Sequence, residues 1–309
     1  MSRVLPFVHH QWPVSALWLL LAVCGTSSTV SANGFLEGSI ATGWEDNLTR
    51  GFWSRDQHDS AFLGAELVAG KLFQPLVNTS LIVSGSASYH SFPSLQGFNR
   101  LSVGTDVTLQ QKFGLGPYSP RLSLTASAVR DALDGRERDR DLYLVQAAYS
   151  QRLSPAWSMS LSAGRETSRG RNEQWLDFSQ LPYTSGTRPT DPMDYYNNVF
   201  AGSLDYEFTN GWLLSGSHQY IDGYIVPTAI PPVFELYSKA KAVALDPAFN
   251  HHQLMYLLKS RSRIWGLNLS VPLSEDSALD FVYSGQDIEA RHVGDYSNFH
   301  FSINLLHRF

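Results

Sequence analysis

The chain has 309 residues, of which 43% are hydrophobic, 13% aromatic and only 17% charged, and its mean hydropathy is −0.17. Outside one N-terminal segment there is no run of about 18 apolar residues, which excludes a bundle of transmembrane helices, and the net charge of −5 gives no basic footprint for nucleic acid. The aromatic residues and the 23 glycines favour β-strands instead.

Residues 1–32 have the features of a secretory signal peptide. Arg3 precedes the apolar segment Val14–Cys24, and a stretch of small residues follows that ends in Val30-Ser31-Ala32, a cleavage site of the A-x-A type. We therefore expect an exported mature chain that forms a single domain over residues 33–309. The one cysteine, Cys24, lies in the signal peptide, so we expect no disulfide to hold the fold together.

From Phe35 onward, apolar and polar residues alternate with a period of two. Between Trp157 and Gly164, every odd position is apolar and every even position is serine or glycine, which predicts a strand with one apolar and one polar face. Twelve segments show this pattern: residues 35–45, 59–72, 79–91, 100–113, 120–130, 139–152, 156–167, 196–209, 211–223, 260–272, 277–290 and 298–309. Ten or fourteen strands remain possible, because residues 250–260 fit either a strand extension or a separate element. Residues 235–245 are weakly helical.

The connections between these segments fall into two classes. Those that follow even-numbered strands are short, such as residues 153–156 and 273–276, whereas several that follow odd-numbered strands are long and polar, such as residues 168–195 and 224–259. In hydrocarbon every backbone amide needs a partner, so a membrane-spanning sheet must close into a barrel, with short turns on one side and long loops on the other. Aromatic residues lie near the strand ends, where membrane interfaces are expected: Trp44, Tyr89, Tyr143, Trp157, Tyr206, Phe208, Trp212 and Phe309.

These features together resemble Gram-negative outer-membrane β-barrels. The last strand sets apolar residues against polar ones and ends the chain on Phe309, which is similar to the C-terminal signal that barrel-assembly machinery reads in that superfamily. The resemblance implies an all-β, closed, antiparallel up-and-down barrel in the cell outer membrane, with short periplasmic turns and long extracellular loops. Its implied partners are outer-membrane lipid, lipopolysaccharide and the assembly machinery. A soluble, secreted β-sandwich is the alternative, but it should carry charges on its outward faces.

A second resemblance covers Gly43-Trp44-Glu45-Asp46-Asn47-Leu48-Thr49-Arg50. This motif is similar to the start of several barrels associated with surface-polysaccharide export or surface-lipoprotein assembly. The alternative, which we favour, is that Asp46 and Asn47 simply turn the chain where it leaves the membrane.

The predicted inward face is rich in small polar side chains, which should leave a water-filled lumen in a barrel of about twelve strands. The side chains that we expect to line the pore are Glu66, Asp106, Asp205, Asp280, Arg121 and Arg152. We therefore predict a narrow channel for small polar or saccharide solutes, with a mild preference for neutral or cationic ones. Alternatively, the acids only pair with bases across the lumen. Other functions that the fold allows are a component of polysaccharide or lipoprotein export, a lipid-modifying hydrolase and an adhesion scaffold.

Candidates for catalysis and metal binding are weak, and we expect no enzyme, no cofactor and no metal site. His218 should face lipid, but its same-face neighbours are Gly216 and Tyr220 rather than the serine that a lipid hydrolase needs. Ser88 and His90 share an inward face. Asp56-Gln57-His58-Asp59 and His251-His252 offer ligands without a recognised spacing. The arginines between Asp131 and Asp141 either pair with lipopolysaccharide phosphates or belong to a solvated loop.

Overall fold

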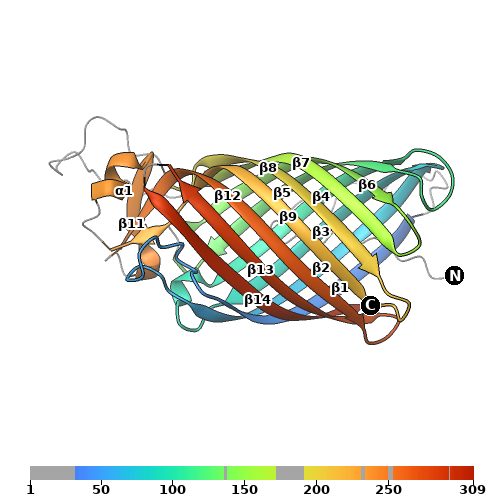
Figure 1. Ribbon diagram of the computed structural model, residues 1–309, viewed down its shortest axis with the longest axis horizontal. Helices are drawn as coiled ribbons and strands as arrows, with labels where there is room; N and C mark the ends of the chain where they lie inside the picture. Colours follow the sequence, from blue (N-terminus) through green and yellow to red (C-terminus); the bar gives the residue numbers. More distant parts are fainter. Residues whose placement is uncertain (1–31, 136–137, 172–190, 231–233, 250–252, 292) are drawn as a thin grey trace, which may run out of the picture.

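The computed structural model describes residues 32–135, 138–171, 191–230, 234–249, 253–291 and 293–309. It shows an elongated barrel of tilted strands, with a small group of additional elements at one end (Figure 1). Among the described residues, no helix has the length and apolarity needed to span a bilayer. The predicted signal peptide lies outside the described residues apart from Ala32.

Twelve strands form the barrel, and two further strands lie outside the ring. The strands of the barrel are β1 (Ala32–Glu45), β2 (Ser60–Leu76), β3 (Thr79–Ser91), β4 (Arg100–Lys112), β5 (Arg121–Leu133), β6 (Arg140–Arg152), β7 (Trp157–Gly170), β8 (Tyr195–Glu207), β9 (Leu213–Ile225), β12 (Gln253–Pro272), β13 (Ser277–Ala290) and β14 (Gly294–Arg308). Each pairs antiparallel with its neighbours along the chain, except that β9 pairs directly with β12. The first and last strands also pair, from Glu37 opposite Arg308 to Glu45 opposite His300, so the sheet closes. The predicted closed barrel of twelve strands is confirmed.

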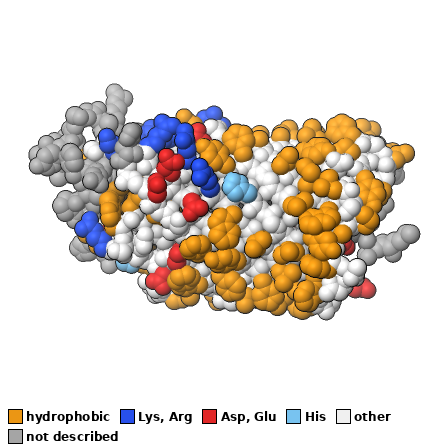
Figure 2. All heavy atoms as spheres, viewed as in Figure 1, with side chains coloured by type: hydrophobic (Ala, Val, Ile, Leu, Met, Phe, Trp, Pro, Cys, Tyr) orange, Lys and Arg blue, Asp and Glu red, His pale blue; other side chains and the backbone are white. Residues whose placement is uncertain are grey.

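Outward and inward faces alternate along every strand of the barrel. On β7, Trp157 and Leu161 are exposed on the outer wall, whereas Ser160 hydrogen-bonds with Ser203 of β8 on the inward face, Oγ to Oγ 2.9 Å. Apolar side chains cover the wall over most of its length, and charged ones gather toward the end that carries the additional elements (Figure 2). Seven of the eight predicted interface aromatics are exposed on this wall, and Tyr206 is half-buried. The exposed ones are Trp44, Tyr89, Tyr143, Trp157, Phe208, Trp212 and Phe309. Because a hydrocarbon-facing wall must be apolar, this belt is the membrane-spanning part.

The two classes of connection occur as the sequence predicts. At the end with short turns, residues 153–156 and 273–276 join consecutive strands, and Gly211, with φ of 86°, forms the turn between β8 and β9. In outer-membrane barrels the end with short turns is periplasmic and the end with long loops is extracellular; we use the same names for the two ends here and call the second the outer end.

The long connection between β9 and β12 contains the additional elements. They are β10 (Thr228–Ala229), the helix α1 (Phe234–Lys239), β11 (Ala242–Asp246) and a 3-10 turn (Pro247–Phe249). Both short strands pair with the first residues of β12, which begins at Gln253 and projects beyond the ring. Residues 250–260 therefore include a strand extension, one of the two options that the sequence left open. The weakly helical residues 235–245 divide into α1 and β11, so that expectation is right for the first half only.

The alternation gives a test of which face meets lipid. Leu124 lies in the apolar part of β5, facing outward, and Ser123 beside it faces the lumen. We expect Leu124→Arg to destabilise the barrel by about 2–4 kcal/mol in a bilayer, the cost of an arginine near the midplane. Ser123→Arg, the matched control, should cost far less because the lumen holds water. Denaturant unfolding in phospholipid vesicles, followed by tryptophan fluorescence, measures both. Equal costs would show that the faces are assigned wrongly.

Candidate functional site at the outer end of the lumen

All six predicted pore-lining residues lie at lumen-facing positions of their strands, although the structure does not gather them into one site. Their measured contacts are local: Asp106 accepts a hydrogen bond from Ser127, and Asp205 accepts one from Ser158 at 3.3 Å. At the periplasmic end, Arg152 pairs with Glu207, Nη2 to Oε2 3.0 Å. Arg308 likewise pairs with Glu37 at 2.8 Å. Two of the periplasmic bases are thus paired with neighbouring carboxylates, while the predicted preference for cations stays a prediction. Glu66, Asp280 and Arg121 occupy the inward faces of β2, β13 and β5.

A denser set of polar side chains lies at the outer end, on the consecutive strands β4 to β8. We call it the polar arc; its members are Arg100, Ser102, Asp131, Arg140, Glu166, Tyr195 and Asn197. Asp131 is fully buried and accepts hydrogen bonds from Arg140 Nε at 3.0 Å and from Ser102 Oγ at 2.7 Å. Arg140 also donates to the Tyr195 hydroxyl at 2.9 Å. The arc therefore holds its carboxylates and donors in fixed positions, as charge-assisted hydrogen bonds do.

The first extracellular loop, residues 46–59, is folded tightly beside this arc. Asn47 is its hub: the side-chain oxygen accepts from the amide of Gly51 at 2.9 Å, and the side-chain nitrogen donates to the Gly51 carbonyl at 3.0 Å. The Thr49 hydroxyl donates to the carbonyl of Asp56 at 2.6 Å. Because Asn47, Thr49 and Asp56 are almost fully buried, the loop is an ordered element. The favoured interpretation of this sequence as a turn agrees with the structure.

This loop positions Arg50 at the outer end of the barrel. The side chain of Arg50 is exposed, and its charge is close enough to act on groups of five strands: Glu45 of β1, Arg100 of β4, Glu166 of β7, Tyr195 of β8 and Tyr296 of β14. Because these strands lie on different sides of the ring, we infer that the guanidinium lies over the mouth of the lumen. We call Arg50 and the polar arc together the outer constriction.

The backbone of Arg50 is held in a strained conformation. Its φ of 55° lies in the left-handed region, and Arg50 is the one residue other than glycine with positive φ in the described part of the chain. Such a conformation costs about 1–3 kcal/mol for a residue with a side chain, and it persists only where the surroundings impose it. Here the Asn47 hub imposes it. Strain of this kind is characteristic of functional positions.

Apolar packing fills much of the remaining outer end. One cluster joins Phe62, Phe92 and Phe98 to Phe249 of the long connection. A second joins Tyr256, Leu258 and Ile288 to Phe52 and Trp53 of the first loop, and a third lies around Met255 and Leu257. These clusters lie mainly on strands outside the polar arc, so the polar surface at this end lies on one side of the lumen.

The long connection is attached to the barrel through a buried ion pair. Arg138 donates from Nε to the Asp246 carboxylate at 3.0 Å and from Nη2 to the Thr228 hydroxyl at 2.6 Å, and it stacks on the Phe98 ring at 4.4 Å. Burial alone would raise the pKa of Asp246, but Arg138 and hydrogen bonds from Thr228 and Ala248 outweigh it and hold the pKa below its ordinary value. We call the segment 226–249, fixed in this way, the cap. The arginines Arg138 and Arg140 therefore bind carboxylates of the protein, which corrects the expectation of a solvated loop.

The alternation of inward and outward positions along the strands is sufficient to predict part of the outer constriction. Arg100, Arg140 and Glu166 occupy the same face as the predicted pore-lining residues but were not among them. Arg50 has no such signal, because its position depends on contacts between distant loops. The backbone amide of Thr228 donates to the Thr49 carbonyl at 3.0 Å, and the amide of Ile230 donates to Asp56 across 174 residues of sequence.

The catalytic and metal candidates do not assemble into sites. His218 lies on the outer wall in register with Gly202 and Trp265. His90 Nδ1 and Ser88 Oγ are buried without hydrogen-bond partners among the described residues, so they do not form a nucleophile and base pair. Within the described ranges, no group of three His, Cys, Asp or Glu side chains is arranged to hold a metal ion. His251 and His252, and most of the loop 168–195, lie outside the described residues.

No protein-family model and no curated protein matches the chain. Among solved structures, it is similar to an outer membrane channel from Pseudomonas putida F1, with a TM-score of 0.53 and 11% identity over 99% of this chain and 100% of that chain. A KdgM porin in complex with disordered oligogalacturonate gives a TM-score of 0.43 and 9% identity, covering 88% and 99%; a NanC porin gives 0.44 and 6%, covering 87% and 98%. The likeness to the Pseudomonas putida channel shows that this chain has the fold of a closed β-barrel of the outer-membrane type.

The buried ion pair should decide whether the cap stays in place. Asp246→Asn leaves Arg138 buried without its counter-charge, so we expect the cap to lose about 3–5 kcal/mol of local stability. Limited proteolysis between β9 and β12 should then become faster. Asp134→Asn is the control, because Asp134 accepts only an exposed hydrogen bond from Asn99.

The same pair sets an expected pH dependence. Because the pKa of Asp246 is lowered on folding, its stabilisation is fully present above the unfolded value of about 3.9 and is lost as the pH falls through the lower folded value. Cleavage of the unaltered protein should therefore be equally slow at pH 7 and pH 5. A cap that opens between these values would contradict the assignment of the ion pair.

Proposed function

We propose that the protein is a narrow channel for small polar or saccharide solutes, and that the outer constriction selects among them. The observation that carries the proposal is the exposed side chain of Arg50, which a strained loop holds at the outer end within electrostatic range of Glu45 and Glu166 on opposite sides of the ring. A structural plug would bury such a charge against a partner, whereas a water-filled passage leaves it solvated.

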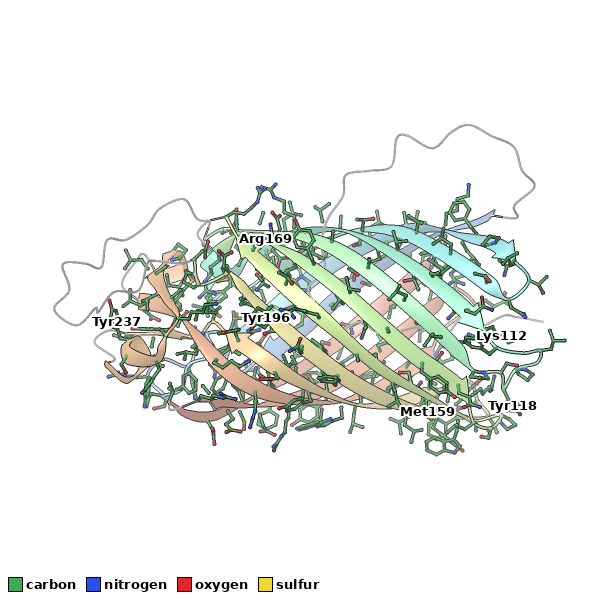
Figure 3. The ribbon with its side chains drawn as sticks, turned by 90° about the horizontal axis from the view of Figure 1, so that it is seen from above. Lys112, Tyr118, Met159, Arg169, Tyr196 and Tyr237 are labelled. Atoms are coloured by element: carbon green, nitrogen blue, oxygen red, sulfur yellow. The ribbon has the colours of Figure 1, made fainter. Side chains whose placement is uncertain are left out.

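The number of strands and the small side chains of the lining favour a lumen that can conduct. Eight strands enclose a space that side chains fill, and sixteen or more leave an open pore, so twelve strands lined by small residues leave a narrow passage. Serines line the inward faces of β3, β5 and β7, where larger side chains would obstruct the path. Figure 3, which views the barrel from above, shows its strands running lengthwise, with Lys112 and Tyr118 near one end and Tyr237 at the other.

The charges along the path suggest how solutes are selected. Carboxylates predominate among the predicted pore-lining residues, and rings of carboxylates attract cations. The outer constriction adds three arginines, Arg50, Arg100 and Arg140, and two carboxylates, Asp131 and Glu166. Both carboxylates are buried and hydrogen-bonded to neighbouring side chains. A solute would therefore meet a polar surface beside the exposed Arg50, an arrangement that suits neutral polar molecules such as sugars with many hydroxyls. Arg50 opposes the entry of small cations.

The other functions considered gain no specific support from these residues. The motif that resembles polysaccharide-export barrels is accounted for by the turn at Asn47 and by the delivery of Arg50. A lipid hydrolase would need a serine beside His218, and its neighbours in register are Gly202 and Trp265. We propose that the protein has no catalytic role. We also propose that Phe309, whose ring packs against Gly38, serves as the assembly signal.

Planar-bilayer recordings test the channel and the constriction together. We expect the unaltered protein to conduct with a weak preference for cations. Arg50→Ala should raise the single-channel conductance and move the reversal potential further toward cation selectivity, because a positive charge leaves the narrowest part. Arg55→Ala is the matched control: Arg55 lies in the same loop, but its side chain is 58% exposed and contacts Asp56 only at 3.7 Å.

The outcomes separate the two parts of the proposal. A complete lack of conductance in the unaltered protein would overturn the channel. If the unaltered protein conducts and neither Arg50→Ala nor Arg55→Ala changes the conductance, the protein is a channel but Arg50 does not control it.

A further inference from the structure

The outer wall of β7, β8, β9 and β12 carries a second feature, which is independent of the lumen. Near the outer end, four arginines face outward from β7 and β12: Arg165, Arg169, Arg261 and Arg263. All four are exposed, and none pairs with a carboxylate among the described residues. Figure 2 shows charged side chains gathered on this part of the wall, next to the apolar belt. Exposed and unpaired arginines at a membrane interface are suited to bind phosphate.

The register fixes the distance between the two pairs of arginines. Arg165 lies opposite Asn198, Asn198 opposite Asp222, and Asp222 opposite Arg261. Three strand spacings of about 4.8 Å therefore separate Arg165 from Arg261, roughly 14 Å in all. This arrangement offers two phosphate sites side by side on one wall.

Asn198 and Asp222 lie directly between Arg165 and Arg261, and two aromatic rings lie in the next outward-facing row, two residues farther toward the outer end. Tyr196 of β8 and Tyr224 of β9 contact edge to face, with 5.8 Å between ring centroids. The Arg165 guanidinium lies over the Tyr196 ring at 4.2 Å, and the Lys259 ammonium lies over Tyr224 at 5.3 Å. In Figure 3, Tyr196 and Arg169 lie toward the same end as Tyr237. Tyrosines at this position present a flat surface to the sugar part of a headgroup.

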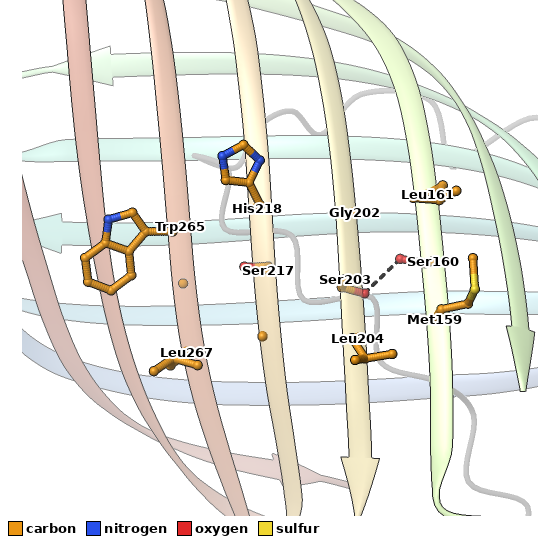
Figure 4. A pocket seen from close by; sticks show the side chains of 12 residues that line it. Met159, Ser160, Leu161, Gly202, Ser203, Leu204, Ser217, His218, Trp265 and Leu267 are labelled. Atoms are coloured by element: carbon orange, nitrogen blue, oxygen red, sulfur yellow. Dashed lines mark hydrogen bonds between the residues drawn. The ribbon is translucent and has the colours of Figure 1, made fainter. Parts of the chain in front are cut away.

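A hollow lies farther along the same strands, toward the membrane midplane (Figure 4). Its volume is about 630 Å³, and its rim consists of outward apolar side chains with His218: Met159, Leu161, Leu204, Trp265 and Leu267. The floor is open because Gly202 and Gly216 carry no side chain. Neither glycine has positive φ, and a Cβ at Gly216 would meet only Leu267 at 3.9 Å. The backbone would therefore accept a side chain at Gly216. Glycine is not needed there for backbone conformation or packing, and its effect is to leave the hollow open.

The arginines and the hollow are aligned. Leu161, Gly202, His218 and Trp265 form one row across the four strands, and this row lies four residues along the strands from the row of Arg165 and Arg261. At about 3.3 Å per residue, the hollow begins roughly 13 Å below the phosphate sites. A molecule that fits both features has anionic groups at its head and acyl chains directed into the membrane.

We propose that this wall binds the lipid A part of one lipopolysaccharide molecule. Lipid A carries a phosphate at each end of a disaccharide, which suits the two arginine pairs, and fatty acyl chains, which suit the hollow. Three acids share this part of the wall: Asp222, which is paired with Lys259 at 3.1 Å, Asp287, which lies opposite Arg263 and accepts from Ser297 at 2.6 Å, and Glu289, which lies opposite Arg261. None of them forms an ion pair with the four arginines among the described residues, so the guanidinium groups keep their donors available. Tight binding of this kind would orient the barrel in the outer leaflet, whether or not the lumen conducts.

Native mass spectrometry of the purified full-length barrel tests the proposal with defined lipids. We expect one bisphosphorylated lipid A to bind per barrel, with dephosphorylated lipid A and phosphatidylglycerol binding at least about tenfold more weakly. Arg165→Gln combined with Arg261→Gln should weaken lipid A binding by about tenfold or more. Gly216→Leu, which fills the hollow and leaves every charge in place, should weaken lipid A and its dephosphorylated form alike.

The matched control is Arg130→Gln. Arg130 is an exposed outward arginine near the outer end of β5, on a different part of the wall. If Arg130→Gln weakens binding as much as the double variant does, the interaction is non-specific and the site is wrong. Equal binding of phosphatidylglycerol and lipid A would contradict a specific lipid A site and would show that the wall binds anionic lipids in general. Unchanged binding in both the double variant and Gly216→Leu would overturn the proposal entirely.

Discussion

Closure of the sheet between β1 and β14 is the constraint on which the rest of the structure depends. A strand edge in hydrocarbon would leave backbone amides without partners, at a cost of several kcal/mol for each group. The register from Glu37 opposite Arg308 to Glu45 opposite His300 removes that edge. Once the ring is closed, every strand must present one face to lipid and one to the lumen, and the alternation seen in the sequence follows directly. Disulfides are unnecessary because the ring itself fixes the ends.

The same closure creates an enclosed space that the loops can narrow. At the periplasmic end the turns are too short to enter it, so the lining there comes from strand residues alone. At the outer end, the first loop and the cap are joined by the hydrogen bond from Thr228 to Thr49, and the cap is joined to the connection between β5 and β6 by the ion pair of Arg138 with Asp246. These contacts supply stability that offsets the strained backbone of Arg50. In the channel that we propose, this loop positions the charge of Arg50 at the outer mouth.

The sequence was sufficient for the barrel because its signal is local. The period of two in β7 is enough to place Leu161 on the outward face and Ser162 on the inward face, without knowledge of any other strand. The lengths of the turns distinguish the periplasmic end of the barrel from the outer end. The same parity applied more fully would have placed Arg100 and Glu166 in the lumen. The position of Arg50 was beyond such reasoning, because it follows from contacts with segments some 180 residues away in the chain. The lipid-facing hollow was also missed, since it arises from glycines on two neighbouring strands that only the register brings together.

The central claim is that a water-filled lumen runs through the barrel and is narrowest at the outer end, beside Arg50. Thiol modification tests it directly in a protein with Cys24→Ala and a single cysteine, Ser127→Cys, on the inward face of β5. Small and bulky water-soluble thiol reagents are applied from either side of a bilayer. We predict that the small reagent reacts from both sides, whereas the bulky one reacts far faster from the periplasmic side. Equal rates for the bulky reagent from both sides would contradict the constriction, and no reaction from either side would contradict the lumen.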